Sequence, residues 1–388
     1  MSFRVSDRLA ALPPYLFVEI DHKRRAAVAA GKDVINLGIG DPDKPTPKFI
    51  IDRMADAIED PRNHRYPFDA GVPEFRTAAA AALKRSYGVE VDPKRELIAL
   101  IGSKEGLGHL PLAVVNPGDY VLVPQPGYPV YQSAAIFAGG TPFYMDMRAE
   151  TGWMPDLDAV PAEIRAKASL MYLNYPNNPT AAVATEAFYT RAVAFAREHD
   201  IVIAQDAAYA DVFFDRPPLS ILTIDGARDV AVEFHSLSKT FNMTGWRIAF
   251  AAGSAEIIDA LARVKSNLDS GQFNAIQAAG VEALEHRDHV QVRAMSDVYR
   301  ERRDALVAGF AQAGIEIDAP QATFYVWAPC PAGLDSMTFV TRVLEEASVV
   351  LIPGNGFGKP GEGYFRAALT VELDRINEAI DRIKRIKW

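Results

Sequence analysis

Short runs of apolar residues recur along the chain between residues 97 and 253. Seven of them are expected to be buried strands, at residues 97–102, 119–126, 141–147, 168–176, 200–209, 230–239 and 246–253. Helical patterns, such as those at residues 127–138 and 185–199, separate the runs. Strands without apolar/polar alternation, joined by helical crossovers, are typical of a mostly parallel sheet that is covered on both faces. The pattern therefore predicts a doubly wound α/β domain.

The pattern changes after residue 271. A long amphipathic stretch at residues 287–313 precedes four short strand-like pieces, EIDAP, TFYVWAP, SVVLIPG and GYFRAAL, and a final basic helix. Residues 1–45 contain one helix (18–30) and a Gly/Pro-rich turn, and this segment is too small to fold alone. We predict a large α/β domain at residues 46–285 and a smaller α+β domain built from residues 1–45 and 286–388.

Composition narrows the possible functions of the chain. It has 388 residues and a formal charge of −9, with no dense stripe of lysine and arginine, so it lacks the footprint of a nucleic-acid binder. One cysteine, Cys330, cannot form an intrachain disulfide or a thiolate metal site by itself. No secretory signal and no apolar run of membrane-spanning length are evident. We expect a cytoplasmic protein that binds no metal, nucleic acid or membrane.

Polar residues follow several of the predicted strands directly. Ligands of open α/β sheets bind at the carboxyl ends of the strands, so these residues are the candidates for chemistry. Lys239 follows one such strand, and burial would lower its pKa, which suits Schiff-base chemistry. Asp206 ends another, where an ionised carboxylate in apolar surroundings needs a cationic partner such as a protonated pyridine nitrogen. Tyr209 and Asn178 can donate hydrogen bonds to a ring oxygen.

Other candidates are suited to holding a phosphate. Ser236 and Ser238 flank the lysine, and Arg247 offers a bidentate, charge-assisted contact. A helix that begins at Ser103 and Lys104 would direct free backbone N–H groups at an anion. Each residue also has an ordinary interpretation when taken alone: an exposed lysine, a helix-capping serine or a core tyrosine.

Together these groups match the needs of pyridoxal 5′-phosphate. The segments LGIGDPD, RYPFDAGVPEFR, GSKEGL, PQPGYPVY, YPNNPT, DAAY and SLSKTFNMTGWR resemble those of a fold-type I, class I/II aminotransferase, over essentially the whole chain. The resemblance implies the PLP-dependent transferase (aspartate aminotransferase-like) fold, with a mostly parallel large domain and a smaller α+β domain. In this family the usual NPTG turn carries a glycine where this chain has Ala181.

The resemblance also implies a role for each matching residue. Lys239 would hold the cofactor covalently and carry a proton between the substrate Cα and the cofactor. Asp206 would keep the ring nitrogen protonated, and Arg366 would bind the substrate α-carboxylate. The remaining matches are Tyr209 and Asn178 on the ring oxygen, Tyr128 stacked on the ring, and Ser103, Lys104, Ser236, Ser238 and Arg247 around the phosphate.

Two further matches concern a second subunit. Tyr66 and Asn274 match residues that reach into the neighbouring subunit's site, at the cofactor and the substrate, which implies a homodimer with shared active sites. Lys104 is the one extra cation that we place near the substrate from the sequence, where Tyr128 and Asn178 would also lie.

Residues 12–47, together with GSKEG, are similar to the LL-diaminopimelate aminotransferase group. The residues of that group that match Tyr15 and Gly40 contact substrate. The resemblance implies amino transfer between LL-2,6-diaminopimelate and 2-oxoglutarate, as in lysine biosynthesis. Three alternatives stay open: an aminotransferase for alanine, aspartate, methionine or aromatic amino acids, a PLP-dependent carbon–sulfur β-lyase, and a catalytically silent binding module. The intact Lys239 and Asp206 argue against the last.

Overall fold

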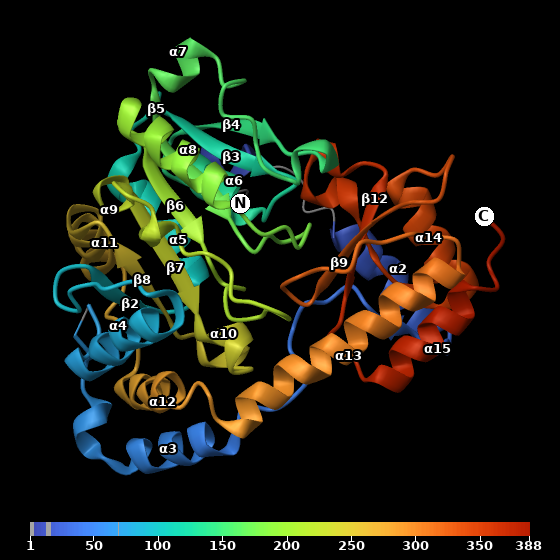
Figure 1. Ribbon diagram of the computed structural model, residues 1–388, viewed down its shortest axis with the longest axis horizontal. Coiled ribbons are helices and arrows are strands. Elements are labelled where there is room, and N and C mark those ends of the chain that lie inside the picture. Colours follow the sequence, from blue (N-terminus) through green and yellow to red (C-terminus); the bar gives the residue numbers. More distant parts are fainter. Residues whose placement is uncertain (1–3, 13–16, 69) are drawn as a thin grey trace.

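The computed structural model describes residues 4–12, 17–68 and 70–388. Its largest sheet has seven strands in the order β2-β8-β7-β6-β5-β3-β4 (Figure 1). Only β8 runs antiparallel to its neighbours, β2 and β7, and the other pairs are parallel. All seven predicted runs form these strands, which are β2 (Leu97–Leu100), β3 (Tyr120–Gln125), β4 (Thr141–Asp146), β5 (Ala168–Asn174), β6 (Val202–Asp206), β7 (Ala231–Ser236) and β8 (Ala249–Gly253). The prediction of a mostly parallel sheet is confirmed.

Helices cover both faces of this sheet. On β2, Ile98 and Leu100 pack into one apolar cluster and Leu97 and Ala99 into another, so alternate positions of the strand point to opposite cores. This double burial explains why the strands show no apolar/polar alternation. One layer contains α5 (Ser103–Val114), α6 (Val130–Phe137) and α11 (Ala255–Leu268), and the other contains α3 (Lys48–Glu59), α4 (Pro73–Tyr87), α8 (Glu186–Glu198) and α12 (Asn274–Glu285).

Two smaller sheets lie in the C-terminal part of the molecule. One is antiparallel, in the order β11-β12-β9, with bounds β9 (Tyr325–Pro329), β11 (Ile352–Pro353) and β12 (Tyr364–Ala368). The other pairs β1 (Ile35–Asn36) in parallel with β10 (Val349–Val350). The N-terminal segment therefore joins the C-terminal layer. Residues 316–320, predicted as a strand, form none: no partner strand lies beside them among the described residues, and Pro320 has no N–H to donate to a ladder.

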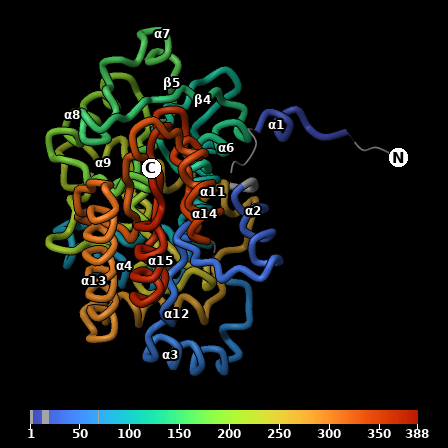
Figure 2. The backbone as a smooth tube through the Cα atoms, turned by 90° about the vertical axis from the view of Figure 1, so that its right-hand side faces the viewer, coloured from blue at the N-terminus to red at the C-terminus, as the bar shows by residue number. Residues whose placement is uncertain are grey.

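The remaining long helices pack around these small sheets. They are α2 (Phe17–Ala29), α13 (Val290–Gln312), α14 (Ser336–Ala347) and α15 (Leu373–Ile383). Figure 2 shows α13, α14 and α15 together on one side of the molecule, with α2 beside α14. The short helices are α1 (Asp7–Ala10), α7 (Ala162–Arg165), α9 (Ala227–Val230) and α10 (Leu237–Thr240). Within the described part of the chain, no helix is long and apolar enough to cross a membrane.

The helix α13 connects the two parts of the molecule. Val292 and Met295, in its first turns, pack into the core of the large sheet, while Leu306 and Phe310 pack into the C-terminal core. In Figure 1 the helix runs from beside α12 to α15. We propose that residues 46–285 form the large domain and that residues 1–45 and 286–388 form the small one, because every strand of the large sheet lies within residues 46–285.

Candidate active site

A cavity of about 430 Å³ lies at the carboxyl ends of the central strands. Its wall takes residues from both parts of the chain. It includes most of the residues that the sequence singled out, namely Gly40, Ser103, Lys104, Tyr128, Asn178, Asp206, Tyr209, Ser236, Ser238, Lys239, Arg247 and Arg366. The parallel strands bring Asn178, Asp206 and Lys239 together, because such strands end at one edge of the sheet. Gly40 and Arg366, which are 326 positions apart, come to the cavity from the N-terminal segment and from β12.

Lys239 lies on α10, immediately after β7. Its Nζ donates a hydrogen bond to the Gly40 carbonyl oxygen at 3.1 Å and lies 5.6 Å from the centre of the Phe324 ring. Burial lowers the pKa of Lys239 to about 8, although Asp41 acts in the opposite direction. A minor but useful fraction of this amine is therefore neutral near physiological pH, and the neutral amine is the nucleophile.

Asp206 is the last residue of β6 and is almost fully buried. The Tyr131 hydroxyl donates to its Oδ2 at 2.8 Å, and the Ala208 N–H donates to its Oδ1 at 3.1 Å. Burial raises the pKa of Asp206 to about 6, against the lowering effect of these two hydrogen bonds. In the described part of the chain both donors are neutral, so this carboxylate is a buried anion suited to a cationic ligand.

A group of donors suited to an anion lies across the cavity. Ser103 begins α5, after Gly102 with φ of +80°. A Cβ on Gly102 would overlap the Arg247 guanidinium, so only glycine allows this approach. Arg247 donates to the Thr244 carbonyl oxygen at 2.8 Å, and Ser236 caps α10 by accepting the Ser238 N–H at 3.2 Å. Hydroxyls, a guanidinium and the first N–H groups of a helix are the usual ligands of a phosphate.

Arg366 lies on β12 and is 7% exposed. It donates to Asn178 Oδ1 and to the Gly38 carbonyl oxygen, both at 2.8 Å. Its guanidinium lies 4.1 Å from the centre of the Tyr325 ring and 4.8 Å from that of Phe357. Its Nε is buried and has no hydrogen-bond partner among the residues described. A buried, charged donor of this kind favours a bound carboxylate.

Residues 38–46, which we call the strap, run across this site. The strap contributes the Gly38 and Gly40 carbonyl oxygens that accept from Arg366 and Lys239. A Cβ on Gly40 would overlap the Tyr325 hydroxyl. The backbone of the strap therefore sets where the Lys239 and Arg366 side chains lie.

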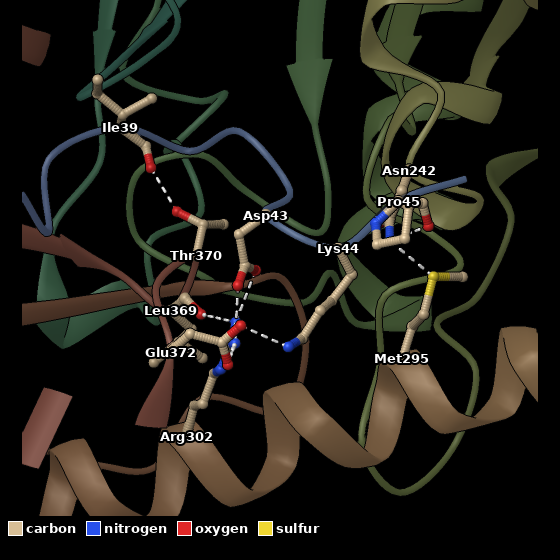
Figure 3. Close-up of polar contacts among 10 residues, drawn as sticks. All are labelled: Ile39, Asp43, Lys44, Pro45, Asn242, Met295, Arg302, Leu369, Thr370 and Glu372. Carbon is tan, nitrogen blue, oxygen red and sulfur yellow. Dashed lines mark hydrogen bonds and ion pairs between the residues drawn. The ribbon is translucent and has the colours of Figure 1, made fainter. Parts of the chain in front are cut away.

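Figure 3 shows how the strap is anchored beyond the site. Asp43 accepts two hydrogen bonds from Arg302 of α13, at 2.7 and 2.8 Å. Burial acts to raise the pKa of Asp43, but Arg302 outweighs it and holds that pKa below the ordinary value. Thr370 donates to the Ile39 carbonyl oxygen at 2.5 Å, and Thr46 donates to the Asn242 carbonyl oxygen at 2.7 Å. The strap is thus tied to both parts of the molecule.

Some site residues were not found from the sequence. Asn174 donates to the Asp206 carbonyl oxygen and accepts the Asn178 N–H, both at 2.8 Å, and the Tyr325 hydroxyl lies 3.1 Å from that of Tyr209. Asn174 could have been found in the same way as Asn178, because it lies at the end of a predicted strand. No sequence signal marks Tyr325, since its place depends on how β9 lies against the segment after β6 that carries Tyr209.

The cavity wall holds one cation that the sequence did not point to. Lys104 is the one extra cation placed near the substrate from the sequence, and Arg24 of α2 lines the cavity as well. The helix was predicted, but its periodicity does not show which face meets the cavity.

Two predicted residues lie away from the described cavity wall. Tyr66 is 88% exposed, and Asn274 is the first residue of α12. Both were assigned to a neighbouring subunit's site, and these assignments stay predictions. Tyr15 lies outside the described residues.

Comparison with known proteins decides the family. The model of the family "Aminotransferase class I and II" matches residues 32–383. The chain belongs to the class I and II aminotransferases. It is 51% identical, over 100% of both chains, to a protein of Syntrophobacter fumaroxidans named LL-diaminopimelate aminotransferase.

Solved structures agree with this class I/II aminotransferase assignment. The substrate-bound structure of BacF from Bacillus subtilis is 38% identical, with a TM-score of 0.94 over 99% of this chain and 98% of that one. An aspartate aminotransferase double mutant from Thermus thermophilus is 29% identical, with a TM-score of 0.92 over 99% of this chain and 100% of that one. The predicted aspartate aminotransferase-like fold is confirmed.

Members of this aminotransferase family use pyridoxal 5′-phosphate, and the residues present fit that cofactor. Asp206 offers a buried carboxylate to a protonated ring nitrogen, and Lys239 offers a partly neutral amine. Arg247 lies close to Gly102, and α5 begins at Ser103. The guanidinium, the serine hydroxyl and the first N–H groups of the helix are donors that can bind the phosphate. When bound, the cofactor supplies an aldehyde that condenses with amines and a ring that withdraws electrons from the substrate Cα.

Proposed function

We propose that this aminotransferase moves an amino group between LL-2,6-diaminopimelate and 2-oxoglutarate, in either direction, in lysine biosynthesis. The observation that carries the proposal is the 51% identity, over the full length of both chains, with a protein named for that activity. The cavity supports it, because it has room beside Lys239 and Arg366 for a long substrate with charged groups at both ends.

We assign the binding of the α-carboxylate to Arg366. Its buried guanidinium is fixed by Asn178 and by the strap carbonyl of Gly38, so a carboxylate bound to it is fixed as well. Fixing the carboxylate orients the Cα–H bond toward the base, a positioning effect that lowers the entropic part of the barrier.

We assign the proton transfer at Cα to Lys239. Its lowered pKa of about 8 suits an amine that must both take and return a proton near neutral pH. Asp206, with Tyr131 bonded to one of its oxygens, would hold a proton on the ring nitrogen, and Tyr209 and Asn178 would contact the ring oxygen. Tyr128 would stack on the ring. The phosphate would be held by Ser103, Lys104 through its backbone, Ser236, Ser238 and Arg247.

We further propose a homodimer with shared active sites. Tyr66 and Phe68 are exposed by 88% and 71% on the segment between α3 and α4. Large exposed aromatic side chains close together in sequence are typical of an interaction surface. Tyr66 and Asn274 would then complete the partner's cavity. We place the enzyme in the cytoplasm, where Cys330 would stay reduced.

Product analysis tests the proposed reaction. Purified holoenzyme is incubated with LL-diaminopimelate and 2-oxoglutarate, and the glutamate formed is quantified. Alanine, aspartate, methionine and aromatic amino acids replace diaminopimelate in parallel reactions. We expect diaminopimelate to give the highest kcat/KM by at least about tenfold. Equal rates with all donors would contradict the proposed specificity, and pyruvate released from cystathionine without an oxoacid would indicate a β-lyase instead.

A further inference from the structure

One wall of the cavity carries an ion pair that the proposed chemistry does not use. Ile20, Asp21 and Arg24 of α2 line the same cavity as Lys239 and Arg366. Positions 20, 21 and 24 share one face of a helix, so the two charged side chains meet the cavity together. Of the other charged side chains in the wall, Asp206, Lys239, Arg247 and Arg366 are already assigned to the cofactor or the α-carboxylate. Lys104 is the remaining one: its backbone is assigned to the phosphate, and its side chain is the extra cation expected near the substrate.

Arg24 and Asp21 can each exchange the other for a charged group of a bound molecule. Arg24 Nε and Nη2 donate to one oxygen of Asp21, Oδ1, at 2.9 and 2.6 Å. The second oxygen, Oδ2, is 2.6 Å from Arg25 Nε. The side chains of Arg24 and Asp21 are 30% and 34% exposed. A pair this accessible to water is held weakly, so a ligand that offers matching charges can replace either partner at little cost.

We propose that Arg24 and Asp21 bind the end of the substrate remote from the reacting carbon, Arg24 taking a carboxylate and Asp21 an ammonium. This inference rests on the proposed function. The distal end of LL-diaminopimelate is itself an amino acid, with one ammonium and one carboxylate. A guanidinium beside a carboxylate is the complementary pair, and it would exchange one internal ion pair for two to the ligand.

The same pair accounts for the second substrate. 2-Oxoglutarate and glutamate carry a distal carboxylate but no distal ammonium, so they would use Arg24 and leave Asp21, which is 34% exposed, to water. Arg24 has a long, flexible side chain and can follow carboxylates at the two different distances. Arg24 therefore serves both half-reactions, and Asp21 serves diaminopimelate alone.

The test compares three variants of the holoenzyme in separate half-reactions with LL-diaminopimelate, L-glutamate and L-alanine. Arg24→Gln and Asp21→Asn remove one charge each from the proposed site. Arg25→Gln is the matched control, since Arg25 also contacts Asp21 but is 73% exposed and is not part of the cavity wall. Visible absorption of the bound cofactor and the thermal unfolding midpoint report whether each variant is folded and loaded.

We expect Arg24→Gln to raise the substrate concentration for half-maximal rate by at least about tenfold for diaminopimelate and glutamate, and to leave alanine unchanged. Asp21→Asn should show that increase for diaminopimelate only. Arg25→Gln should match the unaltered enzyme. Equal effects of Arg24→Gln on all three amino acids, or none on any, would overturn the inference.

The outcome separates this inference from the proposed function. If the unaltered enzyme does not react with diaminopimelate, the proposed function fails, and the glutamate reaction of Arg24→Gln still decides the role of Arg24. If the unaltered enzyme reacts with diaminopimelate and both variants behave like it, the proposed function stands and the Arg24–Asp21 site is wrong.

Discussion

The anchor between Asp43 and Arg302 makes a prediction about both stability and substrate binding. The Arg302 side chain is 1% exposed and donates to both oxygens of Asp43, to the Leu369 carbonyl oxygen at 3.0 Å and to Glu372 at 3.1 Å. Removing one partner of a fully buried ion pair costs about 3–5 kcal/mol. Asp43 keeps 20% of its side chain exposed and can hydrate, so Arg302→Met should cost about 3 kcal/mol.

The expected fall in the thermal unfolding midpoint is roughly 4 °C, because the unfolding entropy is about 2.1 cal/mol/K per residue over a chain of 388 residues. The milder change Asp43→Asn keeps the shape of the side chain and removes its charge. The strap would then be less firmly held where Gly38 and Gly40 meet Arg366 and Lys239. We expect KM for the amino-acid substrate to rise about tenfold, equivalent to ~1.4 kcal/mol, with cofactor retention unchanged.

A matched control comes from the same N-terminal segment. Asp33 also pairs with two arginines, Arg375 and Arg382, but is 63% exposed and lies outside the strap. Asp33→Asn should therefore leave KM and the midpoint nearly unchanged. Steady-state kinetics and thermal unfolding of the three variants provide the measurement. An unchanged KM in Asp43→Asn, or an equal rise in KM in Asp33→Asn, would refute the positioning role of the strap.

Four further outcomes are expected. Lys239→Ala should abolish turnover while the cofactor still binds without a covalent link, so measurable turnover would refute its role. Asp206→Asn should slow turnover on the order of 10²-fold and speed cofactor loss on dialysis; unchanged rates would contradict its partnership with the ring nitrogen. Reloading of cofactor-free enzyme should speed up as pH rises, with a midpoint near 8, because condensation needs the neutral Lys239 amine; a midpoint above 10 would show an ordinary lysine. Ala181, with φ of +60°, is strained, so Ala181→Gly should stabilise the fold by about 1 kcal/mol in thermal unfolding, and a lower midpoint would be the opposite result.

Much of the fold could be predicted because its strands are buried on both faces. Continuous apolar runs between helical crossovers leave few arrangements other than a parallel sheet, and polar residues that follow those runs must gather at one edge. This is why Asp206 and Lys239, which are 33 positions apart, could be placed in one site. The antiparallel direction of β8 was not visible, because its apolar run looks like that of its neighbours.

The parts that were not predicted depend on contacts between the two halves of the molecule. Tyr325 and Arg302 come from the C-terminal part and meet residues of the N-terminal segment. The periodicity of a helix does not show which face of α2 lies against the cavity, or which face of α13 lies against the strap. The failed strand at residues 316–320 has a similar cause, since a strand needs a partner that the local sequence does not specify.

The central claim is that this aminotransferase takes the amino group of LL-diaminopimelate and passes it to 2-oxoglutarate. The most direct measurement is the absorbance spectrum of the purified holoenzyme before and after addition of LL-diaminopimelate, and then of 2-oxoglutarate. The account predicts that the visible band of the bound cofactor bleaches with the amino acid and returns with the oxoacid. A band that diaminopimelate leaves unchanged, while another amino acid bleaches it, would contradict the claim.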